Sequence, residues 1–228
     1  MKFDVLTLFP EIFSVLDSGI LGKALSENKF GVTVTNIRDF ATDKHKKCDD
    51  SPFGGGAGMV MLPEPVYLAI NAADPERQAK RIYVSPKGVP LTQRLVKKLA
   101  EEERILILCG SYEGVDQRVL DAEIDMEISV GDYVLTSGEL PALIIINAVS
   151  RYIDGVLGSP ESVTEESFSD GLLEYPHYTR PQSWHGVSVP EVLVSGNHKL
   201  ITNWRKTKAE ELTKARRPDL TDGKKTKR

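Results

Sequence analysis

The sequence predicts an α/β fold with a mainly parallel sheet, and three observations support this prediction. Short apolar runs alternate along the chain with segments of helical periodicity, which is the pattern of strands joined by crossover helices. The runs Ile82–Ser85 and Ile105–Cys109 are mostly apolar, as expected of parallel strands that are buried on both faces. Each run ends abruptly in a turn that contains glycine. In open α/β sheets, ligands bind outside the carboxyl ends of such strands.

The first part of the chain supplies elements of both kinds. Strands are expected at Lys2–Leu8 and Val32–Ile37, where β-branched and other apolar residues dominate. A helix is expected to begin at Pro10, and another helix at Pro65–Ala73, with proline in its first turn. Residues 40–58 are charged and then rich in glycine, which predicts a loop.

Two further helices are expected around the glycine turns. Thr92 is a suitable N-cap for a helix that runs to about Glu103. The apolar segment Leu140–Tyr152 follows the last glycine turn and predicts a buried helix. Together with the strands, these helices complete one domain, for which we expect residues 1–159.

The composition changes at Ser159. The stretch Tyr152–Thr179 contains no lysine or arginine but several glutamates and serines, which predicts a flexible acidic linker at residues 160–176. We expect a small α-helical C-terminal domain at residues 177–228, with helices at three places: Pro190–Leu193, Lys199–Lys208 and Glu210–Arg217.

Composition excludes several classes of protein. The chain has 228 residues, of which 40% are hydrophobic and 27% charged, as in ordinary globular proteins that bury a core. Its apolar runs are shorter than the ~20 residues of a membrane span. Asp4 and Glu11 near the start are untypical of a signal peptide. Cys48 and Cys109 lack metal-ligand spacing, so we expect no metal, reduced thiols and a cytoplasmic location.

Charge is unevenly distributed along the chain. The net charge is −4, yet residues 199–228 contain eleven basic and four acidic residues. A basic end on an acidic body is consistent with an electrostatic site for phosphates. A frayed basic tail without function would give the same count.

Glycine turns between Arg104 and Ala142 are the main candidates for a ligand site. One contains C-G-S-Y-E-G, and the next contains V-G-D-Y-V-L-T-S-G-E-L-P-A. A third turn of the same form, S-P-K-G, follows Val84. None of them matches G-x-G-x-x-G or the P-loop. Taken alone, the glycines could equally make tight turns and nothing more.

These turns belong to longer segments that resemble one family. C-G-S-Y-E-G-V-D-Q-R-V (109–119) and I-S-V-G-D-Y-V-L-T-S-G-E-L-P-A (128–142) are similar to signature segments of the bacterial tRNA (guanine-N1)-methyltransferases. The resemblance continues in order along nearly the whole chain, in F-D-V-L-T-L-F-P-E-I-F, D-D-S-P-F-G-G-G-A-G-M-V, R-Y-I-D-G-V-L-G, S-F-S-D-G-L-L-E-Y-P-H-Y-T-R-P, V-P-E-V-L-V-S-G-N-H and I-T-N-W-R. Correspondence of this extent is very specific.

The resemblance implies a fold and a cofactor. The family belongs to the SPOUT class, whose parallel-sheet methyltransferase domain contains a deep trefoil knot, expected here within about residues 84–140. The loops of the knot would bind S-adenosyl-L-methionine in a bent form, mainly through backbone groups. The implied cofactor-binding residues are Tyr83, Ser85, Pro86, Gly110, Tyr112, Glu113, Val130, Gly131, Asp132, Tyr133, Val134, Leu135, Gly138 and Pro141.

The implied reaction is methylation of N1 of the guanine that is 3′-adjacent to the anticodon (position 37) of tRNA. Neutral guanine carries a proton on N1, so a base must remove this proton and a cation must stabilise the charge that moves to O6. The family assigns these roles to residues that correspond to Asp170 and Arg151. Without the resemblance, Asp170 would be a solvated linker carboxylate and Arg151 a residue that complements a helix dipole.

The resemblance also implies the partners. We expect a homodimer with shared active sites, in which the linker and C-terminal domain of one chain reach the cofactor of the other. The candidates for tRNA contact are His177, Tyr178, Arg180, Trp204 and Arg205.

Two residues depart from the family pattern, and two other functions stay open. Ser111 replaces a common arginine, and Ser137 replaces a common glycine. One alternative is another enzyme of the class that methylates a ribose or a ribosomal base, for which a linker aspartate would not be needed. The other is a non-catalytic RNA-binding module whose glycine loops are only turns.

Overall fold

The computed structural model describes residues 1–158 and 166–222. The chain divides into two compact units, Met1–Gly158 and Ser159–Arg228, which are described separately. Residues 160–165 of the expected linker and the last six residues of the expected C-terminal domain lie outside the described residues.

The first unit contains the predicted parallel sheet. Its five strands lie in the order β2-β1-β6-β5-β7, and all neighbours are parallel. This confirms the predicted α/β fold with a parallel sheet. The strands are β1 (Lys2–Thr7), β2 (Gly31–Asn36), β5 (Lys80–Pro90), β6 (Arg104–Cys109) and β7 (Met126–Ser129).

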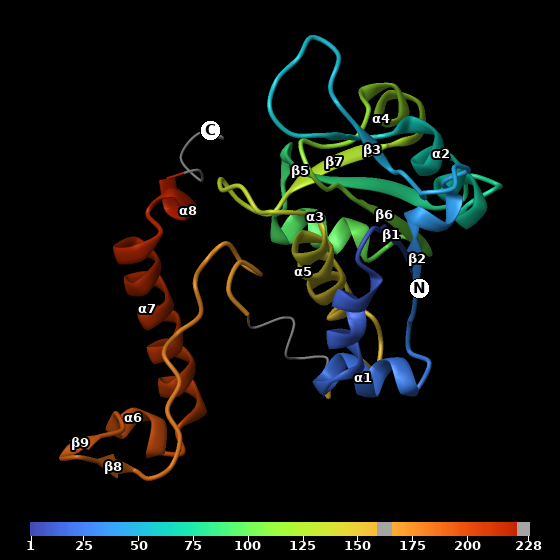
Figure 1. The fold of residues 1–228 in the computed structure, drawn as a ribbon. Coiled ribbons are helices and arrows are strands. Elements are labelled where there is room, and N and C mark those ends of the chain that lie inside the picture. The colour runs from blue at the N-terminus through green and yellow to red at the C-terminus, as the bar shows by residue number, and fades with distance from the viewer. Residues whose placement is uncertain (159–165, 223–228) are drawn as a thin grey trace. The chain divides into compact units, whose positions relative to one another are not determined.

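Helices cover both faces of this sheet, which explains the uninterrupted apolar run of β6. In β6, Ile105 and Ile107 belong to the core on one face, whereas Leu106 and Leu108 belong to the core on the other. Figure 1 shows α3 and α5 on one side of the sheet and α2 and α4 on the opposite side. The first core includes residues of η1 (Pro10–Asp17), α1 (Gly19–Ser26), α3 (Gln93–Leu99) and α5 (Glu139–Ser150); the second includes residues of η2 (Ile37–Phe40), α2 (Pro63–Ala73) and α4 (Gln117–Glu123).

Some elements differ from the predictions. The segment from Pro10 is a 3₁₀ helix, and α3 ends at Leu99 instead of reaching Glu103. Helix α4 was not predicted because it is a short, charged segment; its signal is Asp116, whose carboxylate caps it by accepting a hydrogen bond from the amide of Arg118 (3.0 Å). The predicted loop 40–58 contributes β3 (Asp49–Asp50), which pairs with β4 (Val60–Met61).

The second unit consists mainly of one long helix. α7 (His198–Arg216) is continuous, so the predicted break between Lys208 and Glu210 is wrong: Ala209 is buried within the helix, and alanine is the best helix former. The other elements are β8 (Ser183–Trp184), β9 (Val187–Ser188), α6 (Glu191–Val194) and α8 (Asp219–Asp222).

Part of the expected linker packs on α7. The amide of Leu173 donates a hydrogen bond to the buried hydroxyl of Thr213 (2.8 Å). The guanidinium of Arg217 lies 5.8 Å from the centre of the Phe168 ring. These contacts join residues from 166 onward to the helical unit. Among the helices described, none is long and apolar enough to span a membrane.

Candidate functional site

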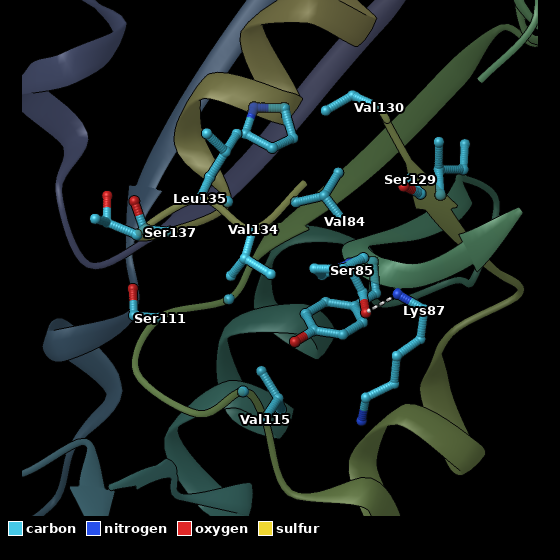
Figure 2. Close-up of a pocket in the computed structure, with 18 of the residues that line it drawn as sticks. Val84, Ser85, Lys87, Ser111, Val115, Ser129, Val130, Val134, Leu135 and Ser137 are labelled. Carbon is cyan, nitrogen blue, oxygen red and sulfur yellow. Dashed lines mark hydrogen bonds between the residues drawn. The ribbon is translucent and has the colours of Figure 1, made fainter. Parts of the chain in front are cut away.

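A pocket of about 260 Å³ lies at the carboxyl edge of the sheet, where residues of β5 meet the loops that follow β6 and β7. Figure 2 shows Val84 and Ser85 from β5, Ser111 from the loop after β6, and Val130 and Val134 from the loop after β7 around this space. Two of the three predicted strand-end loops therefore meet in one cavity. The third prediction, a turn at S-P-K-G, is wrong, because these residues continue β5, which pairs with β7 again at Val89.

Main-chain bonds join the loops after β6 and β7. The amide of Gly138 donates to the carbonyl of Gly110 (2.8 Å). A Cβ atom on Gly138 would lie 2.8 Å from both Cys109 Cα and the amide nitrogen of Gly110. Only glycine permits this approach, because backbone atoms cannot move aside.

The last part of β5 is pinned to β7 in a similar way. The amide of Leu91 donates to the carbonyl of Ser129 (2.8 Å). A Cβ atom on Gly88 would lie only 2.4 Å from the amide nitrogen of Ile128. The backbone of Lys87, which precedes this glycine, is also fixed by a hydrogen bond from its amide to the hydroxyl of Ser85 (3.1 Å).

A fourth segment supports the pocket from the glycine-rich region before β4. The amide of Glu113 donates to the carbonyl of Met59 (2.9 Å), and the amide of Met61 donates to the carbonyl of Gly114 (2.9 Å). Gly58 lies so close to Glu113 that a Cβ atom would be 2.4 Å from its Oε1. Gly58 is the last glycine of the G-G-G-A-G run, and its close contact with Glu113 explains why a glycine stands at this position.

Tyr83 lies at the floor of the pocket and is only 7% exposed. Burial, together with the charge of Glu127, raises the pKa of Tyr83 to about 12, so its phenol is neutral at physiological pH. Burial and the nearby Glu139 raise the pKa of Cys109 well above its usual value. A thiol held in this protonated form is a poor nucleophile.

Glu139 is a fully buried carboxylate at the start of α5. The hydroxyl of Thr7 donates a hydrogen bond of 2.6 Å to Glu139 Oε1. The same hydroxyl accepts a hydrogen bond from the amide of Phe9 (2.9 Å). This chain of bonds joins the end of β1 to α5 directly after Gly138, and so supports the pocket from below.

The structure brings together thirteen of the fourteen residues that the resemblance assigns to the cofactor. Asp132 is the exception: it is exposed and does not line the pocket. Sequence reasoning did not select several other lining residues, of which Lys87 is the only charged one. Its signal was present in the S-P-K-G segment. The thirteen are Tyr83, Ser85, Pro86, Gly110, Tyr112, Glu113, Val130, Gly131, Tyr133, Val134, Leu135, Gly138 and Pro141.

The two departures from the family pattern face each other across the pocket wall. Ser111 and Ser137 pair through an isolated antiparallel bridge, and Figure 2 shows them on neighbouring strands of chain. Ser111 is 4% exposed, and its hydroxyl oxygen has no hydrogen-bond partner among the described residues. The departures therefore form one local change in the wall.

The candidate base and cation belong to different units. Arg151 is half-buried and directly follows α5 in the first unit. Asp170 is exposed and lies in the second unit, in the turn in which the amide of Gly171 donates to the carbonyl of Phe168 (3.3 Å). Within the described part of the chain, no cluster of histidine, cysteine or acidic residues is arranged to hold a metal ion.

Four of the five candidates for tRNA contact lie in an aromatic cluster on the second unit. The rings of Tyr178 and Trp204 are 6.2 Å apart, and the guanidinium of Arg205 lies 4.8 Å from the centre of the Tyr175 ring. The centres of the His177 and Tyr175 rings are 4.9 Å apart. Arg180 is exposed near this cluster in sequence. Trp184, which was not selected, is 66% exposed in the β8–β9 hairpin.

Comparison with known proteins gives a consistent result. Residues 1–223 match the family described as tRNA (Guanine-1)-methyltransferase TrmD. A tRNA (guanine-N(1)-)-methyltransferase of Caldanaerobacter subterraneus subsp. tengcongensis is 55% identical over 221 residues, which are 96% of this chain and 91% of that protein. The protein of that name from Clostridioides difficile is 52% identical over 224 residues, covering 96% and 97% of the two chains.

Proposed function

Because the chain belongs to the tRNA (guanine-1)-methyltransferase family and is an enzyme of that family, we propose that it methylates N1 of the guanine 3′-adjacent to the anticodon (position 37) of tRNA. The observation that carries this proposal is the pocket: the glycine turns of two of the family's signature segments, 109–119 and 128–142, converge on one cavity. Its substrate makes a cytoplasmic location the natural prediction.

The proposed methyl donor is S-adenosyl-L-methionine, which supplies an electrophilic methyl group on a sulfonium. The pocket suits this molecule chemically. The side chains of Val130, Val134 and Leu135 offer apolar surface for a flat ring, and the glycine-rich turns leave backbone groups within reach of its polar edges. We also propose that the strands and loops between about residues 84 and 140 form the trefoil knot of the SPOUT class.

We assign the proton transfer to Asp170 and the charge stabilisation to Arg151. The carboxylate of Asp170 would accept the N1 proton of guanine, which frees the N1 electron pair for attack on the methyl group. The guanidinium of Arg151 would donate hydrogen bonds to O6, where negative charge develops.

The helical second unit is the proposed tRNA-binding domain, at residues 177–228. Aromatic rings and a guanidinium, as at Tyr178, Trp204 and Arg205, offer stacking and cation–π contacts to unpaired bases. Helix α7 carries six basic and two acidic residues, which favours contact with phosphates. The described residues that precede this domain, 166–176, belong to the expected linker.

We further propose that the enzyme is a homodimer, with Asp170 of one chain serving the pocket of its partner. Apolar side chains on the first unit support this proposal. Leu140 and Ile144 of α5 are 54% and 42% exposed, and Val15 of η1 and Ile20 of α1 are 58% and 61% exposed. Such side chains are commonly covered in obligate dimers.

The test is analysis of the reaction product. Purified enzyme, S-adenosyl-L-methionine and a tRNA transcript with guanine 3′ of the anticodon are incubated, and the digested nucleosides are identified by mass spectrometry. We expect 1-methylguanosine, and none from a transcript in which that guanine is replaced by adenine. A methyl group on a ribose or on another ring nitrogen would contradict the proposal.

A further inference from the structure

We propose that Lys87 is a specificity-determining residue that binds the carboxylate at the amino-acid end of the methyl donor. In this arrangement, Glu113 binds the ammonium of the same end. The inference rests on the proposed function, because it concerns how that donor is held. It adds a residue that neither the sequence motifs nor the family resemblance selected.

The charged side chains of the pocket match the amino-acid end of the donor. Twenty-three residues line it, and only Lys87 and Glu113 have charged side chains. One is a cation and the other an anion. S-Adenosyl-L-methionine carries a carboxylate and an ammonium on a single carbon, and the rest of its polar groups are uncharged except for the sulfonium. The charge content of the pocket therefore matches a zwitterionic ligand end.

Lys87 and Glu113 follow neighbouring parallel strands. Lys87 lies in the last part of β5, and Glu113 lies in the turn after β6, with β5 and β6 in register from Lys80 to Val84. The charged pair thus comes from two adjacent strand ends. Figure 2 shows the side chain of Lys87 extending from the strand end toward the side of the pocket on which Val115 lies.

The backbones of both residues are fixed. Lys87 is held by the bond from its amide to Ser85 and by the close approach of Gly88 to Ile128. Glu113 is held by the bond from its amide to Met59. A fixed backbone lowers the entropy that is lost when these residues bind a ligand.

Neither charge is neutralised by the protein. Within residues 1–158 and 166–222, no ion pair or side-chain hydrogen bond engages the ammonium of Lys87 or the carboxylate of Glu113. The arginines Arg81 and Arg104 of the same sheet, by contrast, both form ion pairs. The ammonium of Lys87 and the carboxylate of Glu113 are accordingly free to bind a ligand that carries both a carboxylate and an ammonium.

The test compares two ligands that differ only at the amino-acid end. S-Adenosylhomocysteine has this end, and methylthioadenosine lacks it. Calorimetry measures the Kd of each ligand for the unmodified enzyme, Lys87→Met and Lys87→Arg. The matched control is Lys98→Met, which removes another exposed lysine, in α3, outside the pocket.

We expect Lys87→Met to raise the Kd of S-adenosylhomocysteine by about five- to tenfold. This is the range for a charge-assisted contact that is partly screened by solvent. The Kd of methylthioadenosine should change by less than twofold in Lys87→Met. Lys87→Arg should retain most of the affinity for S-adenosylhomocysteine. Lys98→Met should change the Kd of neither ligand.

Other outcomes would overturn the inference. If Lys87→Met weakened the binding of both ligands equally, or did not weaken the binding of S-adenosylhomocysteine, Lys87 would not bind the carboxylate. If Lys87→Met instead weakened tRNA in a filter-binding assay with S-adenosylhomocysteine unchanged, Lys87 would bind an RNA phosphate. If the unmodified enzyme bound neither ligand, the proposed donor itself would be wrong, and this inference with it.

Discussion

The two edges of the parallel sheet use charge differently. At the amino edge, Arg81 Nε lies 2.8 Å from Asp74 Oδ2, and Arg104 Nε lies 2.6 Å from Asp4 Oδ2. Arg81 also pairs with Glu123 at the end of α4. At the carboxyl edge, the pocket is held by main-chain bonds and close glycine contacts, and its two charged side chains do not pair with each other.

This difference separates stability from binding. Charges that are buried and paired contribute to the folded state and have no capacity left for a ligand. An edge held by backbone bonds can leave its side chains available, because the loops keep their shape without them. The comparison predicts that substitutions at the two edges affect different measurements.

The largest expected effect is a loss of methyl-transfer rate without a loss of donor affinity, which would show that binding and chemistry depend on different residues. Asp170→Asn should lower the rate of methyl transfer by roughly 10²–10⁴-fold, because the amide cannot accept the N1 proton. Donor affinity should be nearly unchanged, since the substitution removes the proton acceptor and leaves the lining of the pocket intact. Single-turnover kinetics measures the rate and calorimetry the Kd. A loss of less than tenfold would remove Asp170 from the mechanism.

The next effect concerns the amino edge. Arg81→Met should reduce the free energy of unfolding by about 3–5 kcal/mol, the usual cost of leaving the partner of a buried pair uncompensated. Arg81 and Asp74 are 1% and 0% exposed. Urea denaturation measures the loss. The Kd of S-adenosylhomocysteine should stay within twofold, and a parallel loss of affinity would show that the two edges are coupled.

A smaller effect is the dependence of stability on pH. Burial alone would raise the pKa of Asp74, but hydrogen bonds from Arg81 and from the amides of Gln78 and Ala79 outweigh it, so this pKa is lowered. A carboxyl whose pKa is lower in the folded state stabilises the fold above its unfolded pKa of about 3.9. This stability is lost as the pH falls through the folded pKa.

Denaturation of the unmodified enzyme between pH 6 and pH 3 should therefore show decreasing stability below about pH 4. In Arg81→Met, the pKa of Asp74 should rise because its main side-chain partner is gone. The folded pKa then lies closer to the unfolded pKa, so the decrease in stability below about pH 4 should be smaller. Identical pH profiles for the two proteins would contradict this role of the pair.

The strands could be predicted from sequence, whereas the walls of the pocket could be predicted only in part. The residues of β6 from Ile105 to Cys109 alternate between two apolar cores, so each of these positions carries the apolar signal. The bridge between Ser111 and Ser137 joins segments whose contact no local pattern encodes. Lys87 was missed for a related reason, since a single lysine after a strand has no periodicity to distinguish it from a solvated one.

The second unit shows the same limit. The predicted helices after His198 were correct in kind, but the break at Ala209 was wrong because the packing of Thr213 and Leu173 continues the helix. The turn from 166 to 175 gave only a compositional signal. Its contacts with α7 depend on residues far along the chain, such as Arg217 over Phe168.

The central claim is that the carboxyl edge of the sheet binds the methyl donor, and calorimetry with one variant tests it most directly. A Cβ atom on Gly110 would lie 2.7 Å from Tyr83 Oη, so Gly110→Trp should fill the pocket. The matched control is Arg77→Met at the amino edge, where Arg77 pairs with Glu123 at 3.2 Å. Cooperative unfolding verifies that both variants are folded.

We expect one S-adenosylhomocysteine per chain in the unmodified enzyme and in Arg77→Met, and no measurable binding in folded Gly110→Trp. Undiminished binding in Gly110→Trp would contradict the account, because the donor would then bind outside this pocket.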